Sequence, residues 1–229
     1  MSSKKDLELF LYKNKLNTTT IIDLLENLSS KTVNSLMFDL KQKFESRDSQ
    51  NSQNKMFIFT DGGCINNGRK NAKAAFSIYF TEDHNSPFYK FNTTELINDP
   101  SNNKAELSGI RKVFQTCFKN KDLFKDNFKE IFICTDSMYS IKCIDTWSKN
   151  WVKNNWKNAK GEPVKNKEII MDILNYKKDI EKENIEINFK HIFSHTKCPQ
   201  EQDSLQYFLW KGNDIVDKNI ILFLKDDQF

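Results

Sequence analysis

Four acidic side chains have the type and spacing to hold divalent cations together. Asp61 closes the apolar run MFIFT, and Asp136 closes the apolar run EIFICT. Glu106 and Asp217 lie in segments with helical periodicity. Carboxylate oxygens are the ligands that hard cations such as Mg²⁺ prefer, and a pair of such ions can activate water and stabilise the leaving oxygen in phosphodiester hydrolysis. The four acids therefore suggest metal-assisted hydrolysis.

Asp61 and Asp136 occupy the ends of two strand-like runs. In an open α/β sheet, ligands bind beyond the carboxyl ends of parallel strands, so neighbouring strands that each end in an acid can present both carboxylates at one point. A chain reversal at Gly62 and Gly63 is expected to expose Asp61. Taken alone, either Asp is more simply a turn former or a helix N-cap, and Asp136 could cap the helix that Ser137 opens. Their joint position, each after a strongly apolar strand, favours a shared site.

Glu106 and Asp217 lie on helices predicted to pack beside those strands. Glu106 falls in the first turn of its helix, where an acid also interacts favourably with the helix dipole. Asp217 lies one turn inside a final helix that Asn213 could cap, and Asp214 competes with it because either side chain could reach the same site. Clustered carboxylates repel one another, which would raise some pKa values and weaken the fold unless cations neutralise them. A divalent metal site would explain why four acids could be tolerated close together.

The elements that must position these acids alternate between strands and helices. Strand patterns cover 56–63, 74–80, 88–92, 130–135 and 185–193. Helical patterns cover 103–118, 137–156, 167–180 and 213–224. The order βββαβααβα predicts an α/β fold with a mixed sheet, in which an antiparallel meander lies at one side and parallel crossover strands lie at the other.

The first part of the chain differs in character from the rest. Two short amphipathic stretches, 19–28 and 30–44, are expected to be helical and make residues 1–44 a small helical N-terminal extension. Residues 45–55 contain nothing to bury and are expected to form a linker. We therefore predict that the main domain is 56–229.

Composition limits the class of protein. The chain has 229 residues, of which 38% are hydrophobic, enough for one substantial core. It contains no apolar run near the roughly 20 residues that cross a bilayer and no apolar signal core at its N-terminus, so neither a membrane protein nor a secreted one is expected. Five scattered Cys are expected to be reduced thiols in an intracellular protein of the cytoplasm or nucleus. A net charge of +4 is compatible with a polyanionic partner.

Four sequence blocks resemble type 1 ribonuclease H, namely TDGGCINNG (60–68), NNKAE (102–106), ICTDSMYSI (133–141) and GNDIVD (212–217). Their order and spacing are also similar to those of the family, and the resemblance extends from Met56 to Leu224. It implies a ribonuclease H-like fold with a five-stranded mixed sheet flanked by helices. It also implies an endonuclease that hydrolyses the RNA strand of RNA/DNA hybrids with two Mg²⁺ ions, for which Mn²⁺ can substitute, and that leaves 3′-hydroxyl and 5′-phosphate ends.

The resemblance assigns catalytic roles. It implies that the metal ligands are Asp61, Glu106, Asp136 and Asp217. The first of these would bridge both metal ions, the next two would complete one metal site, and the last would help hold the metal that delivers the attacking water. His195, in IFSHTK, matches the family's mobile histidine, which assists proton transfer or product release. The stretch between His195 and Asn213 is longer than the family usually has, which leaves the position of His195 open.

The resemblance also implies how a hybrid is bound. Side chains that match contacts to the RNA 2′-hydroxyls are Asn67, Asn102 and Asn103. Those that match an aromatic channel for the DNA strand are Tyr139, Trp147 and Trp151, and those that match part of a DNA-phosphate pocket are Ser101 and Asn166. An Arg that often contributes to that pocket is replaced near Asp99. The segment 147–167 resembles the basic protrusion of cellular family members and includes Lys153 and Lys157, although a solvated helix packed by its tryptophans is a simpler alternative.

Two other functions are left open. The chain could bind hybrids without cutting them, or it could be a related nuclease, such as an integrase or resolvase, that acts on DNA. The presence of all four acids argues against the first, and the three Asn with the basic protrusion argue against the second. Residues 1–54 do not resemble the hybrid-binding domain often found before this fold, and they could pack on the main domain, bind a protein partner or self-associate.

Overall fold

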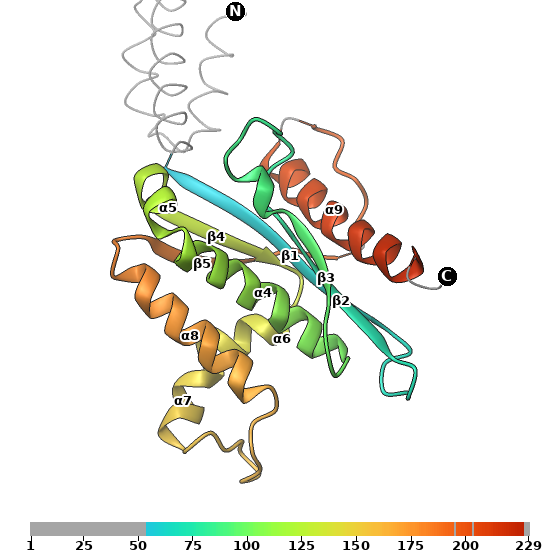
Figure 1. Ribbon diagram of the computed structural model, residues 1–229, viewed down its shortest axis with the longest axis vertical. Coiled ribbons are helices and arrows are strands. Elements are labelled where there is room, and N and C mark those ends of the chain that lie inside the picture. Colours follow the sequence, from blue (N-terminus) through green and yellow to red (C-terminus); the bar gives the residue numbers. More distant parts are fainter. Residues whose placement is uncertain (1–53, 195, 203, 227–229) are drawn as a thin grey trace, which may run out of the picture. The chain divides into compact units, whose positions relative to one another are not determined.

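The computed structural model describes residues 54–194, 196–202 and 204–226, which contain a five-stranded mixed sheet with helices on both faces (Figure 1). The strands are β1 Lys55–Ile65, β2 Lys73–Tyr79, β3 Thr93–Leu96, β4 Glu130–Thr135 and β5 Glu186–His191. The sheet order is β3-β2-β1-β4-β5, with antiparallel pairing on the β2 side of β1 and parallel pairing on the β4 side. The predicted fold class and the position of the meander are confirmed.

Two long helices cover one face of the sheet, and a third covers the other (Figure 1). The helices are α4 Asn102–Lys119, α5 Lys121–Asn127, α6 Met138–Ile141, α7 Ser148–Lys153, α8 Lys167–Glu181 and α9 Leu205–Asp226. A short 3-10 helix, η1 Tyr89–Phe91, precedes β3, and a π-helical segment, η2 Lys142–Trp147, joins α6 to α7. α4 and α8 lie on one face and α9 lies on the other. None of the helices in the described residues is long and apolar enough to cross a membrane.

The chain divides into two units, Met1–Gln53 and Asn54–Phe229. The division falls inside the segment 45–55, which the sequence predicts to be a linker. The predicted helical extension, 1–44, lies outside the described residues, so its structure and its role stay predictions.

The core between the sheet and α4 follows from simple periodicity. Leu107, Ile110 and Phe114 recur at the spacing of one helix face and are fully buried. They share a cluster with Ile131 and Ile133, which alternate along β4 and therefore face the same side of the sheet. Burial of each such side chain stabilises the fold by roughly 1.5–3 kcal/mol. This core holds α4 against β1 and β4, and so against the strands that lead to two of the predicted acids.

β1 and α4 approach each other more closely than side chains would permit. A Cβ atom at Gly62 would overlap the backbone of Ala105 and Glu106, and one at Gly109 would overlap a side chain of β1. Because glycine has no side chain, these two positions let the start of α4 lie directly on the strand. The contact places Glu106 beside Asp61.

β1 is longer than expected. The predicted chain reversal at Gly62 and Gly63 was wrong, because the strand continues to Ile65 and pairs with β2 over this stretch. The turn follows instead, with positive φ angles of 52° at Asn66 and 80° at Gly68. The two glycines in the strand therefore serve close packing rather than a reversal.

The expected strand at 88–92 was also wrong. This segment contains η1, and the edge strand β3 comes directly after it. Phe88 is buried, and its ring centroid lies 5.2 Å from those of both Phe124 and Phe128. Aromatic packing between segments distant in sequence therefore overrides the strand-like alternation.

The last helix begins about two turns earlier than expected, at Leu205 rather than Asn213. The hydroxyl of Ser204 accepts a hydrogen bond from the backbone N–H of Tyr207 at 3.1 Å and so caps the helix start. Phe208 packs its ring against two rings of β1, with centroids 5.4 and 5.6 Å away. Asn213 therefore lies inside the helix and does not cap it.

The helical stretch expected at 137–156 is present as three consecutive segments, α6, η2 and α7. The hydroxyl of Ser148 donates a hydrogen bond to the carbonyl of Ile144 at 2.6 Å across the π-helical part. Wider turns of this kind shift the side chains that follow them around the helix axis. Local periodicity did not indicate this insertion, and it did not indicate α5.

Replacing Gly62 with Ala should destabilise the protein by roughly 1–3 kcal/mol or more, as overpacking of a core does. The added methyl group would overlap helix backbone, which cannot move aside as a side chain can. Gly63→Ala is the matched comparison and should cost less, because its Cβ would meet a methyl group of the Ile220 side chain rather than helix backbone. Urea unfolding measures both variants, and equal stability of the two would contradict the tight contact.

Candidate active site

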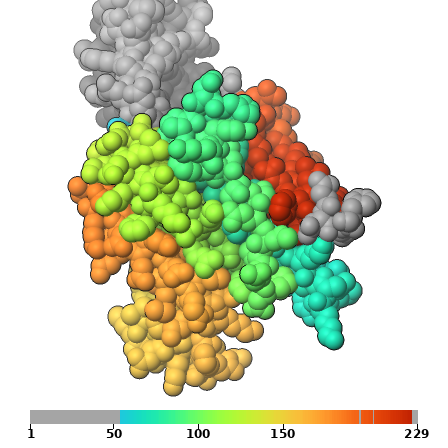
Figure 2. Space-filling model, in the orientation of Figure 1, coloured from blue at the N-terminus to red at the C-terminus, as the bar shows by residue number. Residues whose placement is uncertain are grey.

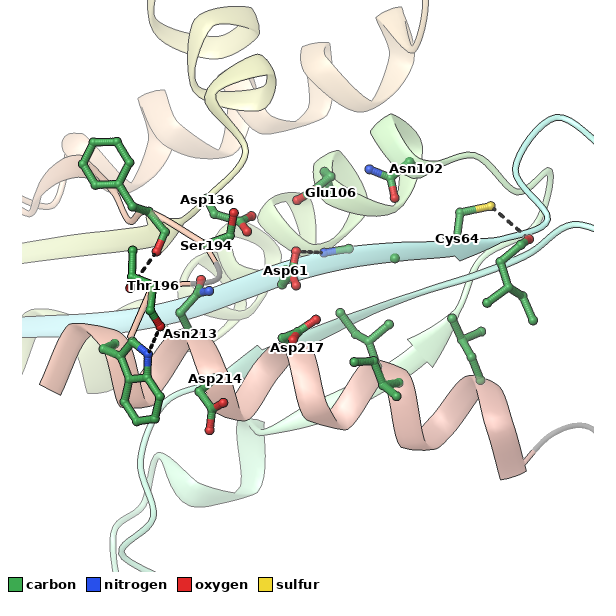
Figure 3. A pocket seen from close by; sticks show the side chains of 18 of the residues that line it. Asp61, Cys64, Asn102, Glu106, Asp136, Ser194, Thr196, Asn213, Asp214 and Asp217 are labelled. Carbon is green, nitrogen blue, oxygen red and sulfur yellow. Dashed lines mark hydrogen bonds between the residues drawn. The ribbon is translucent and has the colours of Figure 1, made fainter. Parts of the chain in front are cut away.

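Three of the predicted acids converge at one point (Figure 3). One carboxylate oxygen from each of Asp61, Glu106 and Asp136 lies within 4.8 Å of the others. The first acid is in β1, the second is near the start of α4, and the third directly follows β4. The parallel register pairs Phe59 with Cys134, so the two Asp, each two positions further along, come side by side. Strand register and helix packing together build the cluster.

Asp217 and Asp214 both line the cavity of about 450 Å³ that contains the cluster, but they point differently (Figure 3). Asp217 points from α9 toward Asp61, and its charge acts on both Asp61 and Asp136. Asp214 points away from the cluster and forms an ion pair with Lys218 at 2.7 Å. This arrangement favours Asp217 as the fourth acid.

Burial and mutual repulsion oppose ionisation of the cluster. Burial, followed by the negative charge of Asp136, raises the pKa of Asp61 to about 7, while the N–H of Gly62, which donates to Asp61 Oδ1 at 2.7 Å, acts in the opposite direction. The pKa of Glu106 stands well above its usual range, first because of burial and then because of the neighbouring Asp charges. Burial also raises the pKa of Asp136, against a hydrogen bond from the side chain of Ser194. The site therefore disfavours full charge unless a cation shares it.

One carboxylate oxygen of the cluster lacks a hydrogen-bond partner in the part of the chain that the structure describes, as a ligand atom for a cation would. Glu106 Oε2 is buried and has no hydrogen-bond partner among the described residues. A buried polar atom left in this way costs on the order of 1–3 kcal/mol. A divalent cation held by Asp61, Glu106 and Asp136 would satisfy that atom and offset the repulsion, and oxygen ligands are those that hard cations prefer. The donor set fits such a cation.

A smaller pocket of about 230 Å³ adjoins this cavity, because Asn102 lines both. The predicted substrate-binding residues that line it are Asn67, Ser101, Asn102, Asn103, Tyr139 and Asn166. Asn67 Oδ1 accepts a hydrogen bond from the backbone N–H of Asn102 at 3.4 Å, which joins the β1–β2 turn to the start of α4. The fold thus brings together residues predicted separately for RNA hydroxyls and for DNA phosphate.

The predicted aromatic residues form a row along the α6–α7 segment. Ring centroids are 6.0 Å apart between Tyr139 and Trp147 and 5.8 Å apart between Trp147 and Trp151. Lys153 and Lys157 follow in the basic protrusion, and both are exposed. In the space-filling view this part of the chain, in yellow, lies at the surface next to α8 (Figure 2).

Asp99 marks a departure from the family pattern beside the predicted phosphate pocket. It has a positive φ angle of 56°, and its carboxylate forms an ion pair with Lys104 at 2.9 Å. A negative side chain therefore stands near the place where the family often has an Arg, and Lys104 supplies the positive charge beside it.

His195 lies outside the described residues, so its predicted role stays a prediction. Its neighbours Ser194 and Thr196 both line the larger cavity. Trp210 Nε1 donates a hydrogen bond to the carbonyl of Thr196 at 3.1 Å, which attaches this loop to α9. The chain on both sides of His195 therefore runs along the cavity that holds the acids.

Two polar residues of the cavity were missed as site residues. The side chain of Ser194 forms a hydrogen bond with Asp136, and Asn213 is buried in the cavity wall. Asn213 was interpreted as a helix cap. The spacing of four residues between Asn213 and Asp217 would have placed both on one helix face, and that was the available signal.

Comparisons with known proteins agree with this geometry. The family model for RNase H matches residues 53–218. Ribonuclease H1 from Mus musculus is 29% identical over 142 residues, which are 62% of this chain and 44% of that protein. Ribonuclease H from Clostridium botulinum is 35% identical over 116 residues, which are 50% of this chain and 70% of that protein. The chain thus spans less than half the length of the mouse relative.

Solved structures share the fold. The solution structure of the PFV RNase H domain has a TM-score of 0.54 at 17% identity and covers 74% of this chain and 94% of its own. The crystal structure of LC9-RNase H1, a type 1 RNase H with the type 2 active-site motif, has a TM-score of 0.50 at 14% identity and covers 74% and 72%. Since the family model matches most of the chain and includes all four predicted acids, this chain belongs to the RNase H family.

Proposed function

We propose that this protein is an endonuclease that hydrolyses the RNA strand of RNA/DNA hybrids. The observation that carries the proposal is the convergence of Asp61, Glu106 and Asp136 within 4.8 Å in a cavity that Asn102 links to the predicted substrate pocket. The names of the relatives, Ribonuclease H1 and Ribonuclease H, support the same reaction. Cleavage would leave a 3′-hydroxyl and a 5′-phosphate.

The proposed cofactor is Mg²⁺, bound as two ions, with Mn²⁺ able to substitute. Asp61, Glu106 and Asp136 would hold the metal, and Asp217 would complete the set from α9. A bound divalent cation polarises the phosphodiester and lowers the pKa of the attacking water. The oxygen-only donor set and the unpartnered Glu106 Oε2 support this assignment.

The protein's own groups orient the acids and handle protons. The N–H of Gly62 holds the Asp61 carboxylate, and the side chain of Ser194 holds that of Asp136. Because both acids are oriented before substrate arrives, little reorganisation is needed during the reaction. His195 directly follows Ser194 in the chain, and we keep for it the proposed role of assisting proton transfer or product release.

Substrate recognition is assigned to the smaller pocket and the protrusion. An amide both donates and accepts hydrogen bonds, as a 2′-hydroxyl does, so the proposed RNA contacts are Asn67, Asn102 and Asn103. The proposed contacts to the DNA strand are Tyr139, Trp147, Trp151, Ser101 and Asn166, and those to backbone phosphates are Lys153 and Lys157.

We also propose that the protein works inside the cell, in the cytoplasm or nucleus, where thiols stay reduced. The five cysteines are odd in number and scattered along the sequence, a pattern that favours reduced thiols over a disulfide framework. For residues 1–54 we keep the proposal of a protein partner or self-association.

Asp136→Asn should slow RNA cleavage by at least about 100-fold, equivalent to about 2.7 kcal/mol in the barrier, because it removes a metal ligand. Asp217→Asn should do the same. Asp214→Asn is the matched control on α9, and it should change the rate little, because that carboxylate pairs with Lys218 and points away from the cluster. Single-turnover cleavage of a labelled hybrid measures all three. A larger loss for Asp214→Asn than for Asp217→Asn would reverse the assignment.

The full protein should cut the RNA of a hybrid in Mg²⁺ and leave duplex RNA and duplex DNA intact when the three are assayed side by side. Preference for duplex DNA would instead identify a DNA-directed nuclease. A hybrid that is bound but stays intact in both Mg²⁺ and Mn²⁺ would identify a binding module.

Metal-free stability should depend on pH through Asp61. Its folded pKa of about 7 lies above its unfolded value, so ionisation penalises the folded state progressively as pH rises from about 4 to about 7. Asp61→Asn should therefore raise the melting temperature in EDTA by several degrees at pH 8, and by much less near pH 4.5. Mg²⁺ should stabilise the wild-type protein more at pH 8 than at pH 5. Thermal scans across this range would refute the coupling if the variant were destabilised at pH 8.

A further inference from the structure

Phe193 is a large apolar residue that the protein leaves exposed to solvent at the acid cavity. It is 74% exposed, more than any other large hydrophobic residue in the described part of the chain. A single exposed apolar side chain needs no explanation by itself. Phe193, however, lines the same cavity as Asp61, Glu106 and Asp136, where a phosphodiester would have to approach. Its position therefore suggests contact with the substrate.

The backbone next to Phe193 is held on both sides. The N–H of Ile192 donates a hydrogen bond to the carbonyl of Thr135 at 3.0 Å, which extends the pairing of β5 with β4 by one residue, and Ile192 is buried. Ser194, which lies beside Asp136 in Figure 3, forms a side-chain hydrogen bond with that acid. Phe193 thus stands between two anchored residues, and its place relative to the acid cluster is set by the fold.

The ring of Phe193 rests against His191, the last residue of β5. The two ring centroids lie 5.0 Å apart and the planes are nearly perpendicular, at 82°. His191 Nε2 donates a hydrogen bond to the backbone carbonyl of Asp136 at 3.1 Å, which holds the imidazole in turn. This contact orients the Phe193 ring while leaving most of it exposed. A ligand that covers a ring already oriented in this way loses less free energy to side-chain ordering.

The apolar ring restricts which part of a nucleic acid it can bind. A charged phosphate loses hydration and gains no hydrogen bond against such a ring. The sugars, by contrast, present C–H groups on either side of each phosphate, and an apolar ring that covers them removes both surfaces from water. When the scissile phosphate lies at the acids, the adjoining sugar lies within the same cavity or at its edge. The sugar is therefore the group that Phe193 is suited to cover.

We propose that Phe193 is a substrate-binding residue whose ring packs against the RNA sugar next to the scissile phosphate. This inference rests on the proposed function. The contact does not depend on base identity, since every nucleotide of the strand carries the same sugar. It adds affinity before the reaction and takes no part in bond breaking, so it acts on KM and leaves kcat unchanged.

Phe193→Ala should raise the Kd for a labelled RNA/DNA hybrid roughly 3- to 10-fold, because the apolar area covered by the ring is lost. Fluorescence anisotropy in EDTA measures this Kd without cleavage. In Mg²⁺, KM should rise by a similar factor while kcat stays the same. The slope of log Kd against log salt should remain that of the wild type, because no phosphate contact is removed. Phe193→Trp keeps a flat aromatic surface and should restore tight binding.

Phe223→Ala is the matched control, since Phe223 is an exposed phenylalanine on α9 that is not among the residues lining the larger cavity. It should keep the wild-type Kd, KM and kcat. Wild-type binding by Phe193→Ala would overturn the inference, as would a changed salt slope, a loss in kcat alone, or a Phe193→Trp protein that binds as weakly as Phe193→Ala.

The binding measurement also separates this inference from the proposed function. A wild-type protein that binds the hybrid and leaves it intact in Mg²⁺ would refute the proposed function, whereas the comparison of Kd values would still decide the role of Phe193. A wild-type protein that does not bind the hybrid would overturn both.

Discussion

The direct contact between β1 and the start of α4 is the constraint on which the rest of the site depends. Gly62 in β1 and Gly109 in α4 have no side chain, so the helix can lie directly against the strand. A larger residue at either position would separate the two elements. Glu106 reaches Asp61 only because of this approach, since a separation larger by one side chain would take its carboxylate out of ligand distance. The buried core around Leu107 and Ile110 holds the two elements in that position. The geometry of the acid cluster is therefore a consequence of close packing.

Close packing also creates the electrostatic problem of the site. Acids brought together in a buried place repel one another and lose hydration, which raises the pKa of Asp61 and Glu106. One backbone N–H, that of Gly62, and one side chain, that of Ser194, offset only part of this effect. The metal-free fold is therefore weakened at the acid cluster, and any cation that binds the folded state alone will stabilise it. The proposed function and the stability of the fold thus depend on the same carboxylates.

The start of α4 also connects the acid cavity to the pocket proposed to bind the substrate. Asn102 and Asn103 precede Glu106 by about one helical turn, and Asn102 lines both the acid cavity and the smaller pocket. A strand held by these amides is thereby positioned relative to the acids without a separate hinge or domain. α9 completes the arrangement from the opposite face of the sheet, where Asp217 and Asn213 lie on one face of the helix. The two layers thus meet at Asp61 within β1 and at the carboxyl end of β4.

Local pattern by itself determined the elements whose burial is regular, namely β2, β4, α4 and α8, and the motif blocks determined the identities of the acids. Local pattern gave the wrong element or the wrong boundary where contacts between residues distant in sequence determine the structure. Packing of Phe88 on Phe124 replaced a strand with η1, and Phe208 on β1 extended α9 backward past Asn213. Only the tertiary structure showed that Asp217 and Asp214 point in different directions, and only it brought six predicted substrate-binding residues into one pocket. Periodicity reports which face of an element is buried, whereas strand register, glycine contacts and the direction of a side chain depend on what lies against that face.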